Sequence, residues 1–186
     1  MAGFEDISKE ITGLVSEWEG KLLSLPEEMI TQRRNSQNRN IKQIVGHLVD
    51  SASNNTHRVV HLQYRELPLR FPNYATYGNN DRWIAIQNYE NENWNNLVQH
   101  LKFSMLHFAH VIQNINPEML QNEWLSDVGE KLTLKKMVEG FVPHFKLHLG
   151  EIEELEAPPQ PSPKGIAVKL RIKESKIKIF DLVFCI

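Results

Sequence analysis

Apolar residues recur at intervals of three and four positions along four long segments of this 186-residue chain. That spacing is typical of amphipathic helices that bury one face. Asn40 is placed to cap the second segment and Thr133 the fourth, while Pro26 and Pro117 mark the ends of the first and third. We expect helices over residues 4–23, 41–65, 89–115 and 134–155. Four such helices, without strand–helix alternation or internal repeats, predict an all-α protein folded as a four-helix bundle.

The composition changes sharply after the fourth segment. Residues 157–165, APPQPSPKG, form a proline-rich linker, and residues 166–186 begin with apolar residues at every second position, which is a strand pattern. From Ala157 on, the chain holds six Lys or Arg and two Asp or Glu. We therefore predict a bundle domain over residues 1–156 and a tail of β character that the core does not need. The alternative is a basic arm that docks a partner.

The overall composition narrows the function classes. With 41% hydrophobic residues, 24% charged residues and a formal net charge of -2, the chain suits one globular domain without a general attraction to nucleic acid or anionic membranes. Cys185 is the single cysteine, and the N-terminal residues lack the pattern of a secretory signal. No apolar run approaches the roughly 20 residues of a membrane span. We expect a cytoplasmic protein that binds neither nucleic acid nor membrane.

Two histidines in the fourth segment are spaced for joint binding. His144 and His148 lie four residues apart in HFKLHLGEIEEL, so a helix places both imidazoles on one face. Catalytic zinc sites typically use three protein ligands, and the second helix offers His47 at the border of its apolar face. Pro143 directly precedes the pair and is expected to kink the helix, because its ring removes one backbone hydrogen bond.

A polar stripe runs beside His47 on the second helix. At about 100° per residue, Asp50, Asn54, Arg58 and His61 fall near the His47 face. Such a stripe either faces solvent or lines a site. Asp50 could act as a general base or orient a metal ligand, and Arg58 could hold an anionic group of a substrate or cofactor or face solvent.

Three stretches carry a resemblance to a known family: IKQIVGHLVDS, NNDRWIAIQNY after a proline-containing loop, and LTLKKMVEGFVPHFKLHLGEIEEL. Over residues 4–156 the chain resembles the DinB/YfiT-like superfamily of small metal-binding four-helix bundles. The resemblance implies that His47, His144 and His148 bind one divalent ion, typically nickel or zinc, with water completing its shell. Asp50 and the following Ser51 match the motif of the YfiT branch.

The family's activities leave the reaction open. Members of the YfiT branch are described as metal-dependent hydrolases, which implies activation of a metal-bound water. Relatives include transferases and isomerases that use a low-molecular-weight thiol, so a metal-dependent thiol S-transferase is the alternative. A non-catalytic metal-binding or interaction module is a third class. The expected partner is a small-molecule substrate, and assembly as a homodimer is a further expectation.

The remaining histidines are expected to lie outside the metal site. His100, His107 and His110 lie off the apolar stripe of the third helix and should face solvent, with His107 and His110 as the alternative ligands. His57 should lie on the surface, whereas His61 is too far along the helix to share the ion and could line a substrate cleft. Trp83 follows the long loop between the second and third helices, which we expect to roof the pocket.

Overall fold

The structure is a computed structural model that describes residues 4–64, 69–72, 74, 77–125, 129 and 131–157. The linker after Ala157 and the predicted β tail over 166–186 lie outside the described residues, so both stay predictions. Within the described part of the chain, no helix combines the length and apolar character that crossing a bilayer requires.

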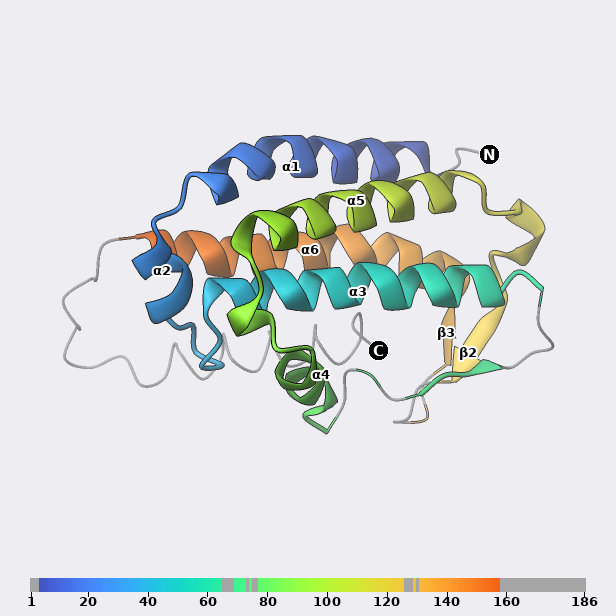
Figure 1. The fold of residues 1–186 in the computed structure, drawn as a ribbon. Coiled ribbons are helices and arrows are strands. Elements are labelled where there is room, and N and C mark those ends of the chain that lie inside the picture. The colour runs from blue at the N-terminus through green and yellow to red at the C-terminus, as the bar shows by residue number, and fades with distance from the viewer. Residues whose placement is uncertain are drawn as a thin grey trace, which may run out of the picture.

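Four long helices form the bundle, as the apolar spacing predicts. They are α1 (Glu5–Leu23), α3 (Ile41–His61), α5 (Trp94–Gln113) and α6 (Leu134–Glu156). In space α1 packs on α5, α5 on α3, α3 on α6, and α6 again on α1, which closes a ring around one apolar core (Figure 1).

The order of helices around this ring differs from their order in the chain. α1 and α3 follow each other in sequence but lie diagonally across the bundle. The connection between them is long enough to cross, and it contains a short helix that the sequence did not predict, α2 (Glu27–Gln32). Long crossover connections of this kind are known variants of four-helix bundles.

Side-chain caps fix where the helices begin. Asn40 accepts from the Gln43 backbone amide while the Gln43 side chain accepts from the Asn40 amide, a reciprocal capping box at the start of α3. Thr133 caps α6 in the same position relative to its helix. Both predicted caps are confirmed. The predicted start of the third helix was too early, because Asn93 caps α5 just ahead of Trp94.

The long connection after α3 is more regular than expected. α3 ends at His61 rather than near residue 65, and the connection contains β1 (Leu69–Arg70), helix α4 (Asn79–Gln87) and the single turn η1 (Tyr89–Asn91). Asn88 ends α4 in the left-handed conformation, with φ of 56°. A second single turn, η2 (Pro117–Met119), follows α5.

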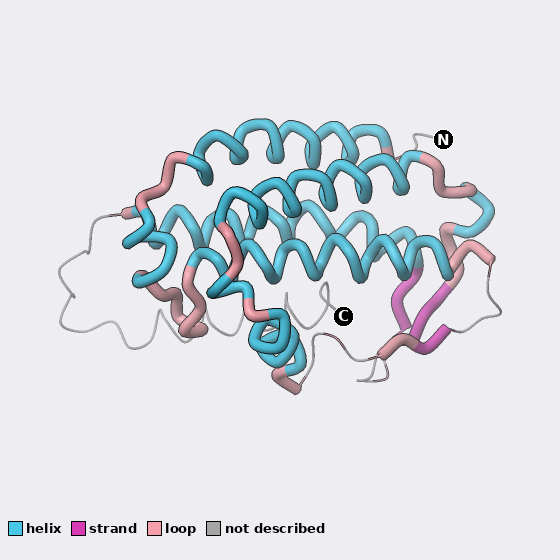
Figure 2. Tube along the Cα trace, viewed as in Figure 1, coloured by secondary structure: helices cyan, strands magenta, loops and turns pink. Residues whose placement is uncertain are grey.

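A small three-stranded sheet lies beside the bundle, near one of its ends (Figure 2). β1 runs parallel to β2 (Glu123–Leu125), and β2 pairs antiparallel with β3 (Lys131–Thr133) (Figure 2). The strands are too short for a period-2 pattern to be detected in the sequence. The sheet lies beside the C-terminal end of α3, where it places Trp124 against that helix.

Candidate metal centre

Three histidines converge in the interior of the bundle. His47 comes from α3, and His144 and His148 come from α6; all three are fully buried, with 0% exposure. The Nε2 atoms of His144 and His148 are 3.0 Å apart, and the His47 ring centroid lies 4.6 Å from that of His148. One nitrogen from each ring lies within 4.8 Å of the other two. The structure therefore brings together the three residues that the sequence singled out.

The geometry of α6 follows from its sequence spacing. Four residues make slightly more than one turn, so the imidazoles of His144 and His148 stack edge to face, with centroids 4.5 Å apart. α6 continues without a break through Pro143, whose ring lies on the exposed side of the helix. The proline therefore precedes the pair without separating it from the core.

Oxygen atoms lie within hydrogen-bond distance of Nδ1 in two of the three imidazole rings. The phenol oxygen of Tyr74 lies 3.1 Å from His47 Nδ1, and a carboxylate oxygen of Glu151 lies 3.0 Å from His148 Nδ1. Asn35 in turn donates to the same Glu151 oxygen at 3.1 Å. When Nδ1–H donates to such an oxygen, the lone pair resides on Nε2, which is the tautomer a metal ligand needs.

This donor set fits a divalent transition-metal ion. Three neutral imidazoles suit zinc, nickel, copper or iron, whereas calcium and magnesium prefer oxygen ligands. Buried imidazoles brought this close together are otherwise costly, since their nitrogens must find partners away from water. The oxygen-held Nδ1 atoms are the arrangement commonly seen around metal-bound histidines. That these residues bind an ion stays a prediction, and the residues present are compatible with it.

Asp50 lies one turn beyond His47 on α3 and is 3% exposed. Its Oδ1 accepts hydrogen bonds from Gln87 Nε2 at 2.6 Å and from the Tyr89 hydroxyl at 2.7 Å. Its Oδ2 is buried and has no hydrogen-bond partner within the described part of the chain. Burial raises the pKa of Asp50 to about 6, and the bonds from Gln87 and Tyr89 oppose this rise. The carboxylate therefore has one anchored oxygen and one available oxygen.

Gly46 makes room for the tyrosine that anchors Asp50. A Cβ at this position would lie 2.2 Å from the Tyr89 ring, so the ring can approach α3 only because residue 46 has no side chain. Burial, followed by the neighbouring charge of Asp50, raises the pKa of Tyr89 above its ordinary value. The phenol therefore remains a hydrogen-bond donor to Asp50 at all physiological pH values.

The α3–α5 connection covers the site, as the sequence predicts for this loop. It supplies Tyr74 to His47, and Gln87 and Tyr89 to Asp50. The Tyr74 and Trp83 rings meet edge to face at 5.1 Å, which joins the Tyr74 segment to α4. Trp83 itself is 37% exposed. We refer to Tyr74, α4 and Tyr89 together as the roof.

The sequence did not identify the residues that support the histidines and Asp50. Glu151 lies three positions after His148, so helical spacing alone could have placed it beside that ring. Gln87 and Tyr89 belong to the stretch NNDRWIAIQNY, which contributed to the family resemblance without pointing to a role. Nothing in the local sequence signals that Tyr74 reaches His47, because that contact depends on how the loop folds back.

Two other residues that the sequence singled out are not members of the histidine cluster. Arg58 is buried, with 2% exposure, and its guanidinium lies 4.7 Å from the centre of the Trp124 ring. The solvent-facing alternative for Arg58 is therefore wrong, and its role in holding an anionic group stays a prediction. Ser51 is fully buried and accepts hydrogen bonds from the Asn55 side chain one turn later, which is a role within α3.

The other described histidines lie outside the buried cluster, as predicted. His57, His100, His107 and His110 are exposed, and His61 is half-buried. His61 contacts His57 and Tyr64, and is not among the clustered histidines of the bundle core. The alternative ligands His107 and His110 thus lie on the outside of α5.

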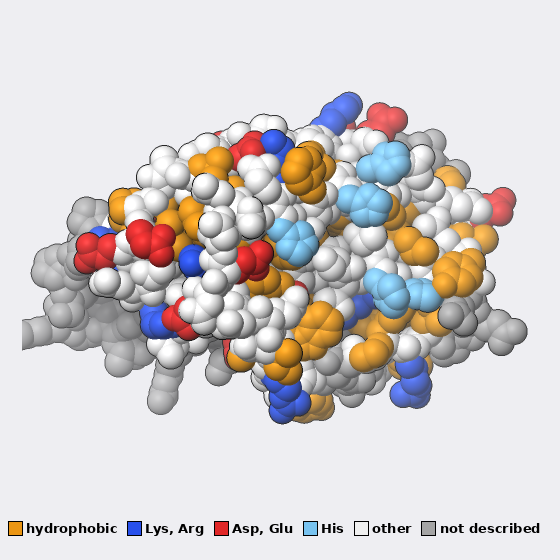
Figure 3. All heavy atoms as spheres, viewed as in Figure 1, with side chains coloured by type: hydrophobic (Ala, Val, Ile, Leu, Met, Phe, Trp, Pro, Cys, Tyr) orange, Lys and Arg blue, Asp and Glu red, His pale blue; other side chains and the backbone are white. Residues whose placement is uncertain are grey.

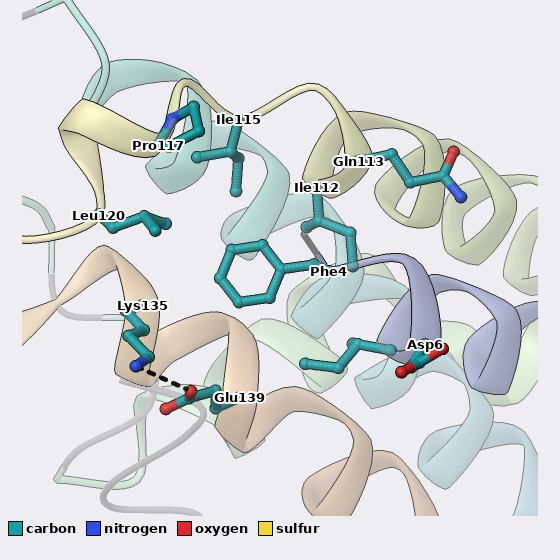
Figure 4. A pocket seen from close by; sticks show the side chains of 10 residues that line it. Phe4, Asp6, Ile112, Gln113, Ile115, Pro117, Leu120, Lys135 and Glu139 are labelled. Carbon is teal, nitrogen blue, oxygen red and sulfur yellow. Dashed lines mark ion pairs between the residues drawn. The ribbon is translucent and has the colours of Figure 1, made fainter. Parts of the chain in front are cut away.

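A separate cavity of about 410 Å³ lies between the start of α1, the end of α5 and the start of α6. Apolar side chains, including those of Phe4 and Ile112, surround it, and Lys135 forms an ion pair with Glu139 at one side (Figure 4). The residues lining this cavity include none of the clustered histidines. It is therefore not part of the candidate metal centre.

A ring of four helices that buries three converging histidines defines a helical-bundle protein with a candidate metal centre. The family model of the DinB superfamily matches residues 16–152. The chain belongs to this superfamily. The predicted family and the predicted bundle are both confirmed.

Two solved structures share this fold. YfiT from Bacillus subtilis, described as a probable metal-dependent hydrolase with an unusual four-helix bundle topology, matches with a TM-score of 0.71 and 15% identity over 81% of this chain and 83% of that one. The mycothiol-dependent maleylpyruvate isomerase, in a variant with one histidine replaced by alanine, matches with a TM-score of 0.60. The identity is 13%, over 82% of this chain and 63% of that one. At these identities the likeness establishes the fold alone. No curated protein sequence matches the chain.

Proposed function

We propose that this protein is a metal-dependent enzyme in which His47, His144 and His148 hold one divalent ion and Asp50 moves a proton. The observation that carries the proposal is the convergence of three fully buried imidazoles, two of them with Nδ1 held by an oxygen. Three clustered imidazoles do not stabilise an apolar core, whereas each of them can donate one nitrogen lone pair to a metal ion.

The bound ion would supply Lewis-acid chemistry, because three neutral ligands leave its double positive charge uncompensated and lower the pKa of a coordinated water or thiol. The chain's own residues then have defined tasks. Tyr74 and Glu151 hold the rings of His47 and His148 in one orientation. Asp50 accepts the proton on its available Oδ2 while Gln87 and Tyr89 fix the carboxylate through Oδ1.

The pKa of Asp50 suits this task. A general base works best when its pKa lies near the operating pH, and burial raises that of Asp50 to about 6. Desolvation thus makes this carboxylate a stronger base than one on the surface. Among the described residues no histidine nitrogen is bonded to Asp50, which favours the base role over orientation of a ligand.

Hydrolysis of an ester or amide is the reaction that we favour. The likeness in fold to YfiT, described as a probable metal-dependent hydrolase, supports it. Transfer of a low-molecular-weight thiol to an electrophile is the second candidate, and the likeness to a mycothiol-dependent isomerase supports it. In that case Arg58 would hold an anionic group of the thiol, as the sequence analysis proposes. Zinc or nickel as the ion, location in the cytoplasm and assembly as a homodimer stay predictions.

The two candidates differ in their need for an added thiol. Metal-loaded protein is assayed on ester, amide and alkyl halide substrates, with and without a panel of low-molecular-weight thiols. Turnover of an ester or amide without thiol supports the hydrolase, and turnover only with thiol supports the transferase. His148→Ala should abolish either activity, whereas His107→Ala, which removes an exposed histidine, should leave it unchanged. A metal-loaded protein that is inactive in every combination contradicts the enzyme proposal.

A further inference from the structure

A second pair of histidines with helical spacing lies on the surface of the bundle. His57 and His61 are four residues apart in the last turns of α3, and His57 is exposed. Figure 3 shows histidines gathered on this face of the molecule, over α3 and α5. The two imidazoles of this pair contact each other, with ring centroids 4.2 Å apart.

The exposed pair reproduces the geometry of the buried pair. The two Nε2 atoms of His57 and His61 are 2.9 Å apart, compared with 3.0 Å for His144 and His148. The ring centroids of the exposed pair lie 4.2 Å apart at an interplanar angle of 74°, and those of the buried pair 4.5 Å apart at 80°. The same edge-to-face arrangement therefore occurs twice in the chain, once in the core and once at the surface.

Neighbouring side chains hold the exposed pair in place. The Tyr64 hydroxyl lies 2.7 Å from His61 Nδ1, as Glu151 lies beside Nδ1 of His148. Phe71 packs near both imidazoles, with ring centroids 6.0 Å from His57 and 5.9 Å from His61. These contacts restrict the rotamers of the two histidines, so less side-chain entropy is lost when both bind the same ligand.

We infer that His57 and His61 form a second, surface site for a divalent transition-metal ion. Two metal–nitrogen bonds of about 2.0–2.1 Å at right angles place the nitrogens about 2.9 Å apart, the separation that the structure shows. When His61 Nδ1–H donates to the Tyr64 oxygen 2.7 Å away, the ring lone pair is on Nε2, where it can bind the ion. Among common divalent ions, copper binds imidazole sites most strongly, followed by nickel and zinc.

The surface site differs from the core cluster in strength and access. It offers two protein ligands where the core offers three, so it binds more weakly and leaves several positions for water or an exogenous ligand. His57 is ten residues beyond His47, which corresponds to about 15 Å along the helix. The two sites therefore load independently, and the surface ion exchanges freely with solvent.

Retention on immobilised Cu²⁺ tests the surface site alone, because the core histidines are fully buried and cannot reach a resin. Untagged full-length protein is compared with His57→Gln and His61→Gln, and with His100→Gln and His107→Gln as controls that each remove one exposed histidine. We expect the first two variants to lose retention and the controls to keep it. Equal losses in all four variants would show that retention depends on the number of exposed histidines and not on this pair, and would overturn the site.

A Cu²⁺ titration in solution provides an independent readout. The wild-type protein should bind one more equivalent of Cu²⁺ than His57→Gln, with both proteins equally helical by circular dichroism. Tyr64→Phe should weaken binding of that equivalent by about 10 to 100-fold, the usual effect of removing a group that orients a ligand. Tyr77→Phe is the matched control at an exposed tyrosine. Equal stoichiometry in the wild-type protein and His57→Gln would overturn the inference without bearing on the core histidines.

Discussion

Asp50 and Gly46 show how much of this site depends on single residues outside the histidine cluster. Asp50 is held through one oxygen, and its other oxygen is buried without a hydrogen-bond partner among the described residues. Gly46 leaves room for the Tyr89 ring whose hydroxyl binds Asp50. The sequence could propose Asp50 from its position one turn after His47, but left its role open between base and orienting residue. Resolving the two roles requires knowing which oxygen is bonded and to what, and that depends on the fold of the roof.

Asp50→Asn tests the base role directly. The amide keeps an oxygen for Gln87 and Tyr89 but cannot accept a proton, so turnover should fall by about 10² to 10⁴-fold with the ion still bound. Steady-state kinetics and metal analysis of the same preparation provide the check. An unchanged turnover with metal affinity lowered by about 10 to 100-fold would instead assign Asp50 to orienting a ligand.

Gly46→Ala tests the close approach of Tyr89 to α3. The new Cβ would lie 2.2 Å from the Tyr89 ring, so the ring must move and its bond to Asp50 must break. We expect a loss of about 1–3 kcal/mol in the free energy of unfolding, measured with urea, and a fall in turnover.

The control for this change is Gly13→Ala on the exposed side of α1. A Cβ there has no heavy atom within 4 Å, so the variant should gain about 0.5–1 kcal/mol from the better helix propensity of alanine. If Gly46→Ala is as stable and active as Gly13→Ala, Tyr89 does not depend on the missing side chain.

At the scale of elements, the long helices could be predicted, whereas the short elements and the contacts of the roof could not. The apolar period and the caps Asn40 and Thr133 are local signals. They identified all four long helices and the starts of α3 and α6, although the predicted end of α3 was too late and the predicted start of α5 too early. The strands have two or three residues each, and α4 has only nine, so neither produces a reliable pattern. The candidate ligands were found because they lie on the predictable helices.

The roof makes its own testable contribution through Tyr74. Tyr74→Phe removes the hydroxyl 3.1 Å from His47 Nδ1 and leaves the aromatic ring in contact with Trp83. We expect metal affinity to fall by about 10 to 100-fold, measured by competition with a chromogenic chelator, with little change in stability. Tyr77→Phe removes a hydroxyl from a 77% exposed tyrosine in the same connection and should bind metal as the wild-type protein does. Equal metal affinity in both variants would show that the Tyr74 hydroxyl does not contribute to metal binding.

Across the described residues, the four long helices form a closed ring around one core, and α6 is the last helix of that ring. The last residues of α6 are tied to the α1–α3 side: Arg33 Nη1 donates to the backbone oxygens of Leu155 and Ala157, and Lys21 pairs with Glu156 at 3.3 Å. The sequence predicts that the bundle ends at residue 156, and Arg33 also contacts the backbone of Ala157.

Truncation after Ala157 should therefore leave the bundle intact. The shortened protein keeps every contact of α6 described above, so we expect unchanged helicity, metal content and unfolding midpoint. Circular dichroism and elemental analysis of the shortened protein, compared with the full chain, make the test. Loss of helical or metal-loaded protein would show that the tail is integral to the fold.

The central claim is that His47, His144 and His148 share one ion. The most direct measurement is elemental analysis of reconstituted full-length protein, after a weak chelator has removed ions from the surface histidines. The wild-type protein and His107→Ala should each retain about one equivalent of a divalent transition metal. His148→Ala should retain none, because the remaining two ligands do not compete with the chelator. Retention by His148→Ala together with loss in His107→Ala, or a wild-type protein that retains no ion, would contradict the account.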